Sequence, residues 1–198
     1  MAQKAASFIG GRIPAPVCGF RIRYRQNQKY PGRHPLWRGG LTLCVFRIGF
    51  DGDVTLEGLA YGSRLSNGRW HVNAPGSGQP VVYTAQSRAL AQLEKRVHCN
   101  GVQPVEQALM RIELLDGALM LHAVDIGLAA NWKADEGYTQ GFGLAWLRGK
   151  KSLGLWVPSY VEPFEGNLLL NPRHDQYHTH VQVVIERSPF EFDPRMLA

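Results

Sequence analysis

Residues 81–98 read VVYTAQSRALAQLEKRVH and combine two patterns of different period. Val81 to Thr84 is a run of β-branched and aromatic residues, which favours a short strand. Ser87 is a preferred N-cap residue and predicts a helix from Arg88 to about His98. We therefore predict a strand that leads directly into a helix.

The predicted helix has an amphipathic pattern. Its apolar stripe contains Ala89, Leu90, Leu93 and Val97. At about 100° per residue, counted from Ala89, this stripe spans about 0–100° and Glu94 falls at about 140°. Glu94 therefore lies at the border of the expected buried face. A carboxylate there is partly desolvated, which indicates either an interaction partner or a functional role. Gln92, Lys95 and Arg96 are expected to point elsewhere.

Short strands dominate the remainder of the chain. We predict further strands at residues 41–50, 105–115, 118–126, 152–157, 168–170 and 181–185, a helix at 139–147 and a tail at 189–198. Turns are expected at Asp51-Gly52-Asp53, Asn67-Gly68 and Asp116-Gly117. Many short strands with two or three helices in mixed order predict an α+β fold.

The composition is that of an ordinary soluble globular protein. The 198 residues are 44% hydrophobic and 19% charged, which suits one domain with an appendage. The longest apolar runs are too short to span a bilayer, and the N-terminus lacks the apolar core of a signal peptide. Three widely spaced cysteines without a CxxC motif favour free thiols in a reducing compartment. We expect a cytoplasmic protein without a membrane partner.

The positive charge is concentrated at the N-terminus. Residues 1–40 contain eight Lys or Arg and no Asp or Glu (+8), whereas the remaining 158 residues contain 14 against 16 (−2). We therefore predict a basic arm at residues 1–40 and a domain at residues 41–198. Such an arm is typical of contact with nucleic acid, an acidic partner or an anionic surface, and a solvated extension is the alternative. Phe20 to Arg25 alternates apolar and cationic residues, as a strand with one buried face does.

Three common motifs are absent from the sequence. Gly141-Phe142-Gly143 lacks the third glycine of G-x-G-x-x-G, and Gly149-Lys150-Lys151-Ser152 lacks the upstream glycine of a P-loop. Ser159 does not stand in G-x-S-x-G. These absences argue against Rossmann, P-loop and α/β-hydrolase folds.

Several residues allow both a functional and a purely structural interpretation. Arg69 follows the Asn67-Gly68 turn, and its planar fork suits two phosphate oxygens, although a surface arginine is the alternative. Arg47 stands between apolar neighbours in a strand, so it points outward or is paired in a pocket. Tyr83 could be core or face a ligand, and Ser159 follows a proline that holds its backbone extended.

Together with Glu94, these residues suit an anionic, ribose-bearing and partly aromatic ligand, such as a dinucleotide of the NAD type. Trp70 is either a pocket wall or core packing. A zinc site at His174, His178 and His180 is not predicted, because no acid or cysteine completes it.

The combination resembles the RES family, which is named for an arginine, a glutamate and a serine and includes toxins of bacterial toxin–antitoxin pairs. The resemblance runs from about Leu43 to Leu197 and leaves out the arm. It is carried by VFRI (45–48), NGRW (67–70), VVYTA (81–85), ALAQLE (89–94), VPS (157–159), NLLLNP (167–172), His174 and FDPR (192–195). No single segment is specific, but their order and spacing match the family.

The resemblance implies an ADP-ribosyltransferase-like α+β fold with mixed β-sheets. It implies an enzyme that cleaves the nicotinamide–ribose bond of NAD⁺, as substrate and without a further cofactor or metal, and passes ADP-ribose to phosphate or water. Transfer to a target protein is the alternative. The implied catalytic residues are Arg47, Tyr83, Glu94 and Ser159, and the implied NAD⁺-binding residues are Arg47, Arg69, Trp70, Tyr83 and Ser159.

The resemblance also implies a helix-turn-helix antitoxin, or an immunity protein, that blocks the pocket; a homo-oligomer is left open. His71 stands where the family usually has asparagine, so a contact near the ribose is expected to differ. The loop at 72–79 is long, and the arm has no counterpart, which keeps a delivered effector domain as an alternative. Two further alternatives are a binding protein without catalysis and a non-catalytic module that binds nucleic acid through the arm, although the −2 domain argues against the latter.

Overall fold

The computed structural model describes residues 41–73 and 79–197. The basic arm at 1–40, with its predicted strand at 20–25, and the middle of the 72–79 loop lie outside the described residues. None of the helices within the described ranges is long and apolar enough to cross a membrane.

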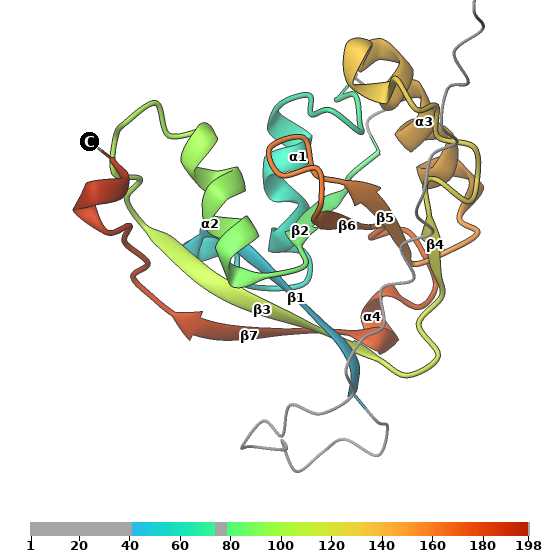
Figure 1. Ribbon diagram of the computed structural model, residues 1–198. Coiled ribbons are helices and arrows are strands. Elements are labelled where there is room, and N and C mark those ends of the chain that lie inside the picture. The colour runs from blue at the N-terminus through green and yellow to red at the C-terminus, as the bar shows by residue number, and fades with distance from the viewer. Residues whose placement is uncertain (1–40, 74–78, 198) are drawn as a thin grey trace, which may run out of the picture. The chain divides into compact units, whose positions relative to one another are not determined.

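One seven-stranded sheet organises the described residues, with the strand order β4-β5-β6-β2-β1-β3-β7 (Figure 1). The strands are β1 Leu41–Phe50, β2 Val82–Ala85, β3 Gln107–Leu115, β4 Met120–His122, β5 Gly154–Pro158, β6 Gly166–Leu170 and β7 Val181–Arg187. Neighbouring strands are antiparallel except for β4 and β5, which are parallel. The predicted α+β class is confirmed.

Four α-helices accompany the sheet in the described part of the chain. They are α1 Tyr61–Leu65, α2 Arg88–Val97, α3 Glu136–Gly149 and α4 Tyr177–His180. The two longer helices begin at side-chain caps, as Ser87 Oγ accepts from Leu90 N at 3.0 Å and Asp135 Oδ1 accepts from Tyr138 N at 3.0 Å. Both caps satisfy backbone donors that the first helical turn leaves without partners.

The side chains of β2 alternate between the two faces of the sheet. One face contributes to the central apolar cluster, and the other face contributes to two further clusters. Val82 packs into the central cluster with Val45 and Met110. On the other face, Ala85 packs with Leu90 of α2, and Tyr83 packs against the cluster beneath α3. The strand therefore places Tyr83 between the two helix-covered halves of the sheet.

The pairing of β1 is uneven. Against β3 it is paired from Leu41 to Phe50, but against β2 it has the single register pair Phe46↔Ala85. Beside that pair, the guanidinium of Arg47 donates from Nη1 to the backbone oxygen of Tyr83 at 2.8 Å. This junction brings Arg47 and Tyr83 together from segments that lie far apart in the sequence.

The predicted buried stripe of α2 is wrong at three of its four positions. Ala89, Leu93 and Val97 are exposed, whereas Leu90 and Ala91 are buried. The inner face therefore runs from about 100° to about 240° on the earlier count, with Glu94 inside it. The helix packs on β1 and β2 and also borders the pocket that contains Glu94 and Lys95, so its inner face is not uniformly apolar.

Other differences from the predicted elements have local causes. The strand expected at 118–126 ends at His122, because the chain turns through residues 123–127, where Gly127 has a φ of +97°. The helix expected from Thr139 begins at Glu136 because Asp135 caps it. The helices α1 and α4 were not predicted. His178 and His180 lie in α4 and not in a strand, so they do not share a strand face.

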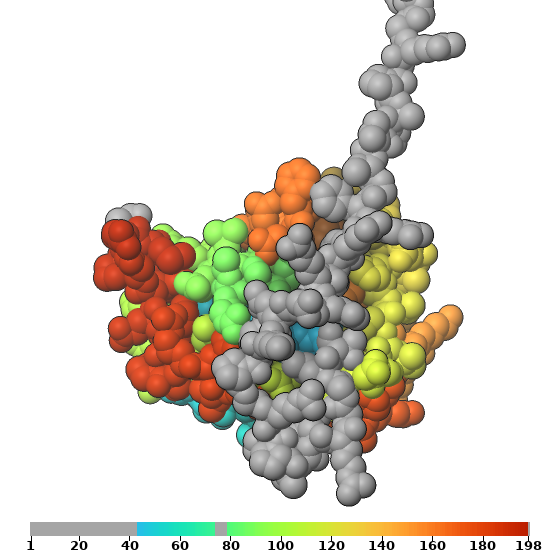
Figure 2. Space-filling model, turned by 60° about the horizontal axis from the view of Figure 1, so that its bottom comes forward, coloured from blue at the N-terminus to red at the C-terminus, as the bar shows by residue number. Residues whose placement is uncertain are grey.

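The C-terminal segment covers one side of α2. Phe190 and Phe192 are buried and pack with Leu90 and Ala91. Arg96 of α2 also donates to the backbone oxygen of Met196. Figure 2 shows these last residues, in red, against the green surface of α2. The tail is therefore part of the domain.

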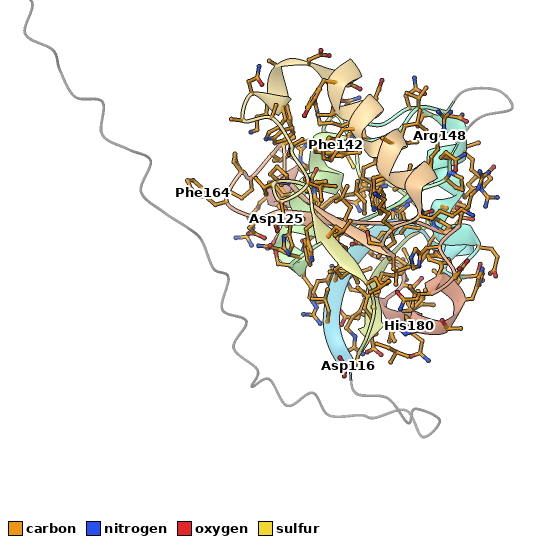
Figure 3. The ribbon with its side chains drawn as sticks, turned by 90° about the vertical axis from the view of Figure 1, so that its right-hand side faces the viewer. Asp116, Asp125, Phe142, Arg148, Phe164 and His180 are labelled. Atoms are coloured by element: carbon orange, nitrogen blue, oxygen red, sulfur yellow. The ribbon has the colours of Figure 1, made fainter. Side chains whose placement is uncertain are left out.

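The loop between β5 and β6 carries an exposed aromatic side chain at its tip. Phe164 is 91% exposed, and Figure 3 shows it projecting from the body of the sheet and helices. At the base of this loop, Ser159 N donates to the backbone oxygen of Glu165 at 3.0 Å. Glu165 in turn accepts from Ser87 Oγ at 2.8 Å, so the loop is attached to the start of α2.

Candidate active site

A pocket of about 600 Å³ lies between α2, the β1–β2 junction and the segments at 62–71 and 160–167. This size is typical of small-molecule sites. Five of the six residues singled out from the sequence line it, namely Arg47, Arg69, Trp70, Tyr83 and Glu94. The sixth, Ser159, lies directly behind Glu94.

The carboxylate of Glu94 is held through one of its two oxygens. Ser159 Oγ donates to Oε1 at 2.7 Å, and Asn167 Nδ2 donates to the same oxygen at 2.6 Å. No hydrogen bond from the described residues reaches Oε2. The carboxylate is therefore oriented by the protein on one side and keeps its second oxygen for another partner.

The hydroxyl of Ser159 is fully used within the protein. The residue is 0% exposed, and its Oγ also accepts from the backbone N–H groups of Val161 at 3.1 Å and Glu162 at 3.0 Å. In the sequence analysis Ser159 is a direct contact to the ligand. The structure instead places it as a support for Glu94.

Asn167 is a site residue that the sequence analysis did not single out. It opens β6 at the edge of the apolar run Leu168–Leu170, lines the pocket and bonds to Glu94. A polar residue at the start of an otherwise buried strand is the signal that could have identified it. Its contact partner is 73 residues away in sequence, so no local pattern reveals the pairing.

Arg47 lies within the protein without an ion pair to any described carboxylate. Burial lowers the pKa of its guanidinium, and the nearby Asp53 opposes this shift. Arginine remains charged in proteins despite such a shift. A desolvated cation that faces a pocket gains free energy when an anion binds there.

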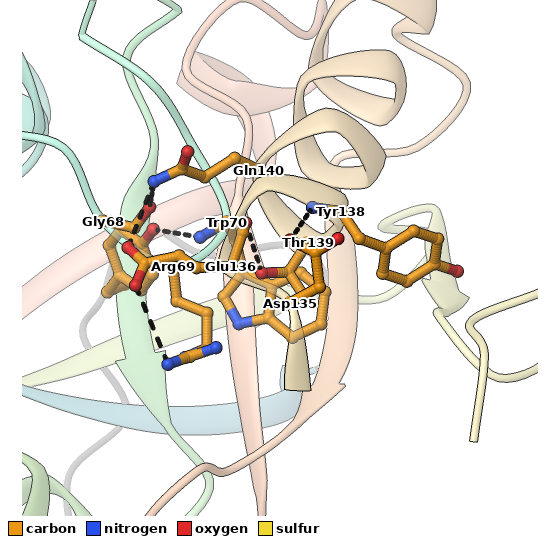
Figure 4. A network of polar contacts seen from close by, with 9 residues as sticks. Gly68, Arg69, Trp70, Asp135, Glu136, Tyr138, Thr139 and Gln140 are labelled. Atoms are coloured by element: carbon orange, nitrogen blue, oxygen red, sulfur yellow. Dashed lines mark hydrogen bonds and ion pairs between the residues drawn. The ribbon is translucent and has the colours of Figure 1, made fainter. Parts of the chain in front are cut away.

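Arg69 is held between an aromatic ring and α3. Its guanidinium carbon lies 4.1 Å from the ring centroid of Tyr160, and its Nη2 lies 3.9 Å from Glu136 Oε2. Gln140 ties the same helix to the preceding residue, since its Nε2 donates to the Gly68 oxygen at 3.2 Å and to Glu136 Oε1 at 3.1 Å (Figure 4). Because this ion pair is long and partly exposed, it orients the Arg69 side chain but neutralises little of its positive charge.

Lys95 lines the pocket, and the expectation that it points elsewhere is wrong. Burial lowers the pKa of its ammonium group, and the positive charge of Arg47 lowers it further. The described lining thus contains three cationic side chains, Arg47, Arg69 and Lys95, against the single carboxylate of Glu94. The pocket suits a ligand with more than one negative charge.

The phenol of Tyr83 is bonded to two neighbouring residues of the pocket lining. Its Oη accepts from Trp70 N at 3.2 Å and lies 2.8 Å from His71 Nδ1. Burial raises the pKa of this phenol well above its usual range, so it stays neutral. Tyr83 presents its ring as one wall of the pocket.

The pH dependence of stability should carry a contribution from His71. Burial lowers its pKa below the ordinary value of 6.5, although hydrogen bonds to Ser63 and Ser66 oppose the shift. Between the two pKa values the unfolded chain binds a proton that the folded chain does not, so stability falls as the pH drops below about 6.5. Chemical denaturation at about pH 7.5 and about pH 5.5 measures the loss, which should be smaller in His71→Asn. Equal losses in both proteins would contradict this assignment.

The family model of the RES domain matches residues 45–193, which is most of the chain. The chain belongs to the RES domain family. The match falls within the domain expected at 41–198 and leaves out the arm.

Curated relatives of this RES protein are named as toxins. It is 38% identical over 157 residues to "Toxin Res" of Yersinia enterocolitica, which covers 78% of this chain and 99% of that protein. It is 37% identical over 118 residues to the "Prs ADP-ribosylating toxin" of a Sphingobium species, which covers 57% of this chain and 71% of that protein. The RES domain here is thus similar to the Yersinia toxin over nearly its full length and to the Sphingobium toxin over most of it.

A solved structure shares the fold of this RES domain. The crystal structure titled as the M. tuberculosis MbcT–MbcA toxin–antitoxin complex matches with a TM-score of 0.54 over 80% of this chain and 88% of that chain. The sequence identity is 18%, so the likeness extends to the fold alone.

Proposed function

We propose that this RES protein is a toxin that cleaves the nicotinamide–ribose bond of NAD⁺ and transfers ADP-ribose to an acceptor. The observation that carries the proposal is one pocket in which an oriented carboxylate, Glu94, accompanies the three cations Arg47, Arg69 and Lys95. NAD⁺ is a substrate with a pyrophosphate, ribose hydroxyls and a cationic ring, so it supplies a partner for each of these groups.

The role of Glu94 follows from the chemistry of the bond. Nicotinamide leaves as a neutral molecule, so bond cleavage needs no proton donor. The barrier lies in the oxocarbenium-like ribose, as in glycoside hydrolysis. Glu94 Oε2, which carries no hydrogen bond from the described residues, is the group that stabilises this positive charge. Ser159 and Asn167 hold the carboxylate in place.

The cations would bind the other end of the substrate. Arginine side chains bind two phosphate oxygens at once, and Arg47, Arg69 and Lys95 offer three such positive groups around the pyrophosphate. Tyr83 and Trp70 supply aromatic walls, and Tyr83 is suited to stack on nicotinamide.

The acceptor of ADP-ribose is phosphate or water in this proposal. Transfer to a protein is the second candidate, because the Sphingobium relative is named as an ADP-ribosylating toxin of Prs. An antitoxin is the proposed neutralising partner, since the structural neighbour is titled a toxin–antitoxin complex.

The decisive experiment is incubation of the purified protein with NAD⁺ in three mixtures: buffer, buffer with inorganic phosphate, and buffer with purified Prs. We expect nicotinamide release in at least one mixture, and the mass of the ADP-ribose product identifies the acceptor. Release that is lost in the Glu94→Gln protein assigns the activity to this pocket. Intact NAD⁺ in all three mixtures, with correctly folded protein, would overturn the proposal.

Lys95 offers a separate test of the anion-binding end. We expect Lys95→Gln to raise the KM for NAD⁺ about tenfold, because a charged hydrogen bond is lost. The KM of the parent should also depend more strongly on salt than that of the variant. Lys151→Gln, at an exposed position outside the pocket, is the matched control. An unchanged KM in Lys95→Gln would place the pyrophosphate elsewhere.

A further inference from the structure

We infer that His71 is the positioning residue that fixes Tyr83 as a rigid wall of the pocket, an inference that rests on the proposed function. His71 is 2% exposed and borders the pocket beside Tyr83. Its Nδ1 lies 2.8 Å from Tyr83 Oη. The altered contact near the ribose that is expected at this position stays a prediction, and the geometry adds a role that acts through Tyr83.

Two carbonyl groups fix the tautomer of His71. Its Nε2 lies 3.0 Å from the backbone oxygen of Ser63 and 3.0 Å from that of Ser66. Carbonyl oxygens only accept hydrogen bonds, so Nε2 must carry a proton. Both carbonyls belong to α1 or its C-terminal end, which anchors the imidazole to that helix.

The other ring nitrogen then dictates the state of Tyr83. In the neutral imidazole Nδ1 is an acceptor, so Tyr83 Oη must donate its proton to it. The backbone N–H of Trp70 donates to the same Oη at 3.2 Å. The phenol proton of Tyr83 is therefore committed to the protein, and Tyr83 acts through its ring and not as a proton donor to the substrate.

Close packing at Gly68 supports this arrangement. A Cβ atom at Gly68 would lie 2.7 Å from Tyr83 Oη and 2.9 Å from His71 Nδ1. Both distances are too short for real contacts, so no side chain fits against the pair. The segment that carries Arg69 is thus packed directly onto the hydrogen bond between His71 and Tyr83.

Two substitutions of His71 test the roles of its two ring nitrogens separately. Asparagine places an acceptor oxygen near the position of Nδ1 and retains a partner for Tyr83. Glutamine places a donor near the position of Nε2 and retains the contacts to Ser63 and Ser66, but offers Tyr83 no acceptor there. We expect kcat to fall about tenfold in His71→Gln and to stay within about threefold of the parent in His71→Asn, because a small misplacement of a substrate-positioning group is costly.

A double-mutant cycle connects this effect to Tyr83. In a Tyr83→Phe background, His71→Gln should cause no further loss of kcat, since the hydrogen bond is already absent. Thermal melting of each variant separates this result from loss of folded protein. An equal kcat loss with and without the Tyr83 hydroxyl overturns the inference, as does full kcat in His71→Gln.

A measurement without turnover keeps the inference distinct from the proposed function. Nitrogen-15 spectra of the parent protein at neutral pH should show His71 protonated on Nε2 alone, and Tyr83→Phe should shift the Nδ1 signal. A proton on Nδ1 overturns the inference whether or not NAD⁺ is consumed. Absence of nicotinamide release with the expected spectrum overturns the proposed function and leaves the hydrogen bond in place.

Discussion

We expect the Glu94→Gln protein to release nicotinamide from NAD⁺ about 10²–10³-fold more slowly than the parent. Glutamine keeps the oxygen that accepts from Ser159 and Asn167, so the local structure is retained. It removes the negative charge that we propose faces the ribose carbon. The loss should therefore fall on kcat, whereas the affinity for NAD⁺ changes little.

Two measurements make the Glu94 result interpretable. Calorimetric titration with NAD⁺ shows whether the variant still binds substrate, and thermal melting shows whether it is folded. Glu191→Gln, at an exposed carboxylate in the C-terminal segment, should keep full activity. A folded Glu94→Gln protein that binds NAD⁺ and releases nicotinamide at the parent rate would refute the role of this carboxylate.

The second large effect is expected in stability, from Gly143→Ala in α3. A Cβ atom at position 143 would lie 1.9 Å from the backbone oxygen of Trp70. Either α3 or the segment that carries Arg69 must move. We expect a loss of about 3 kcal/mol, at the upper end of overpacking effects. For a domain of this size that corresponds to a fall in Tm of roughly 6–12 °C.

The same helix supplies the control for Gly143. Gly141 has open space where its Cβ would lie, so Gly141→Ala should be neutral or stabilise the protein by up to about 1 kcal/mol through helix propensity. Thermal denaturation of both variants tests the contrast. A Tm for Gly143→Ala at or above that of the parent would contradict the close approach of α3 to Trp70.

The local part of the fold could be predicted from sequence. The β-branched run at 81–84 and the cap at Ser87 specify their structure within a few residues, and the helix α2 and its cap are found as expected. The same pattern placed Glu94 only at the border of the buried face, and the structure places it inside that face. Such features depend on propensity and hydrogen bonds between near neighbours.

The remainder of the site depends on contacts that no local pattern contains. The inner face of α2 was assigned wrongly at most positions because part of it borders a pocket built from distant segments. Lys95 lines this pocket, whereas Leu93 is exposed to solvent. Ser159 and Glu94 are 65 residues apart in sequence. Only the folded sheet brings β5 and β6 to the end of α2, and with them the support for the carboxylate.

Two consecutive residues directly after β5 contact two different side chains of the pocket. Ser159 bonds to Glu94, and the ring of Tyr160 stacks on Arg69. A shift of this short stretch would therefore break the contacts to the Glu94 carboxylate and to the Arg69 guanidinium at the same time. The loop that continues from this stretch carries the exposed ring of Phe164, so a substitution that reshapes the loop is expected to disturb both side chains together.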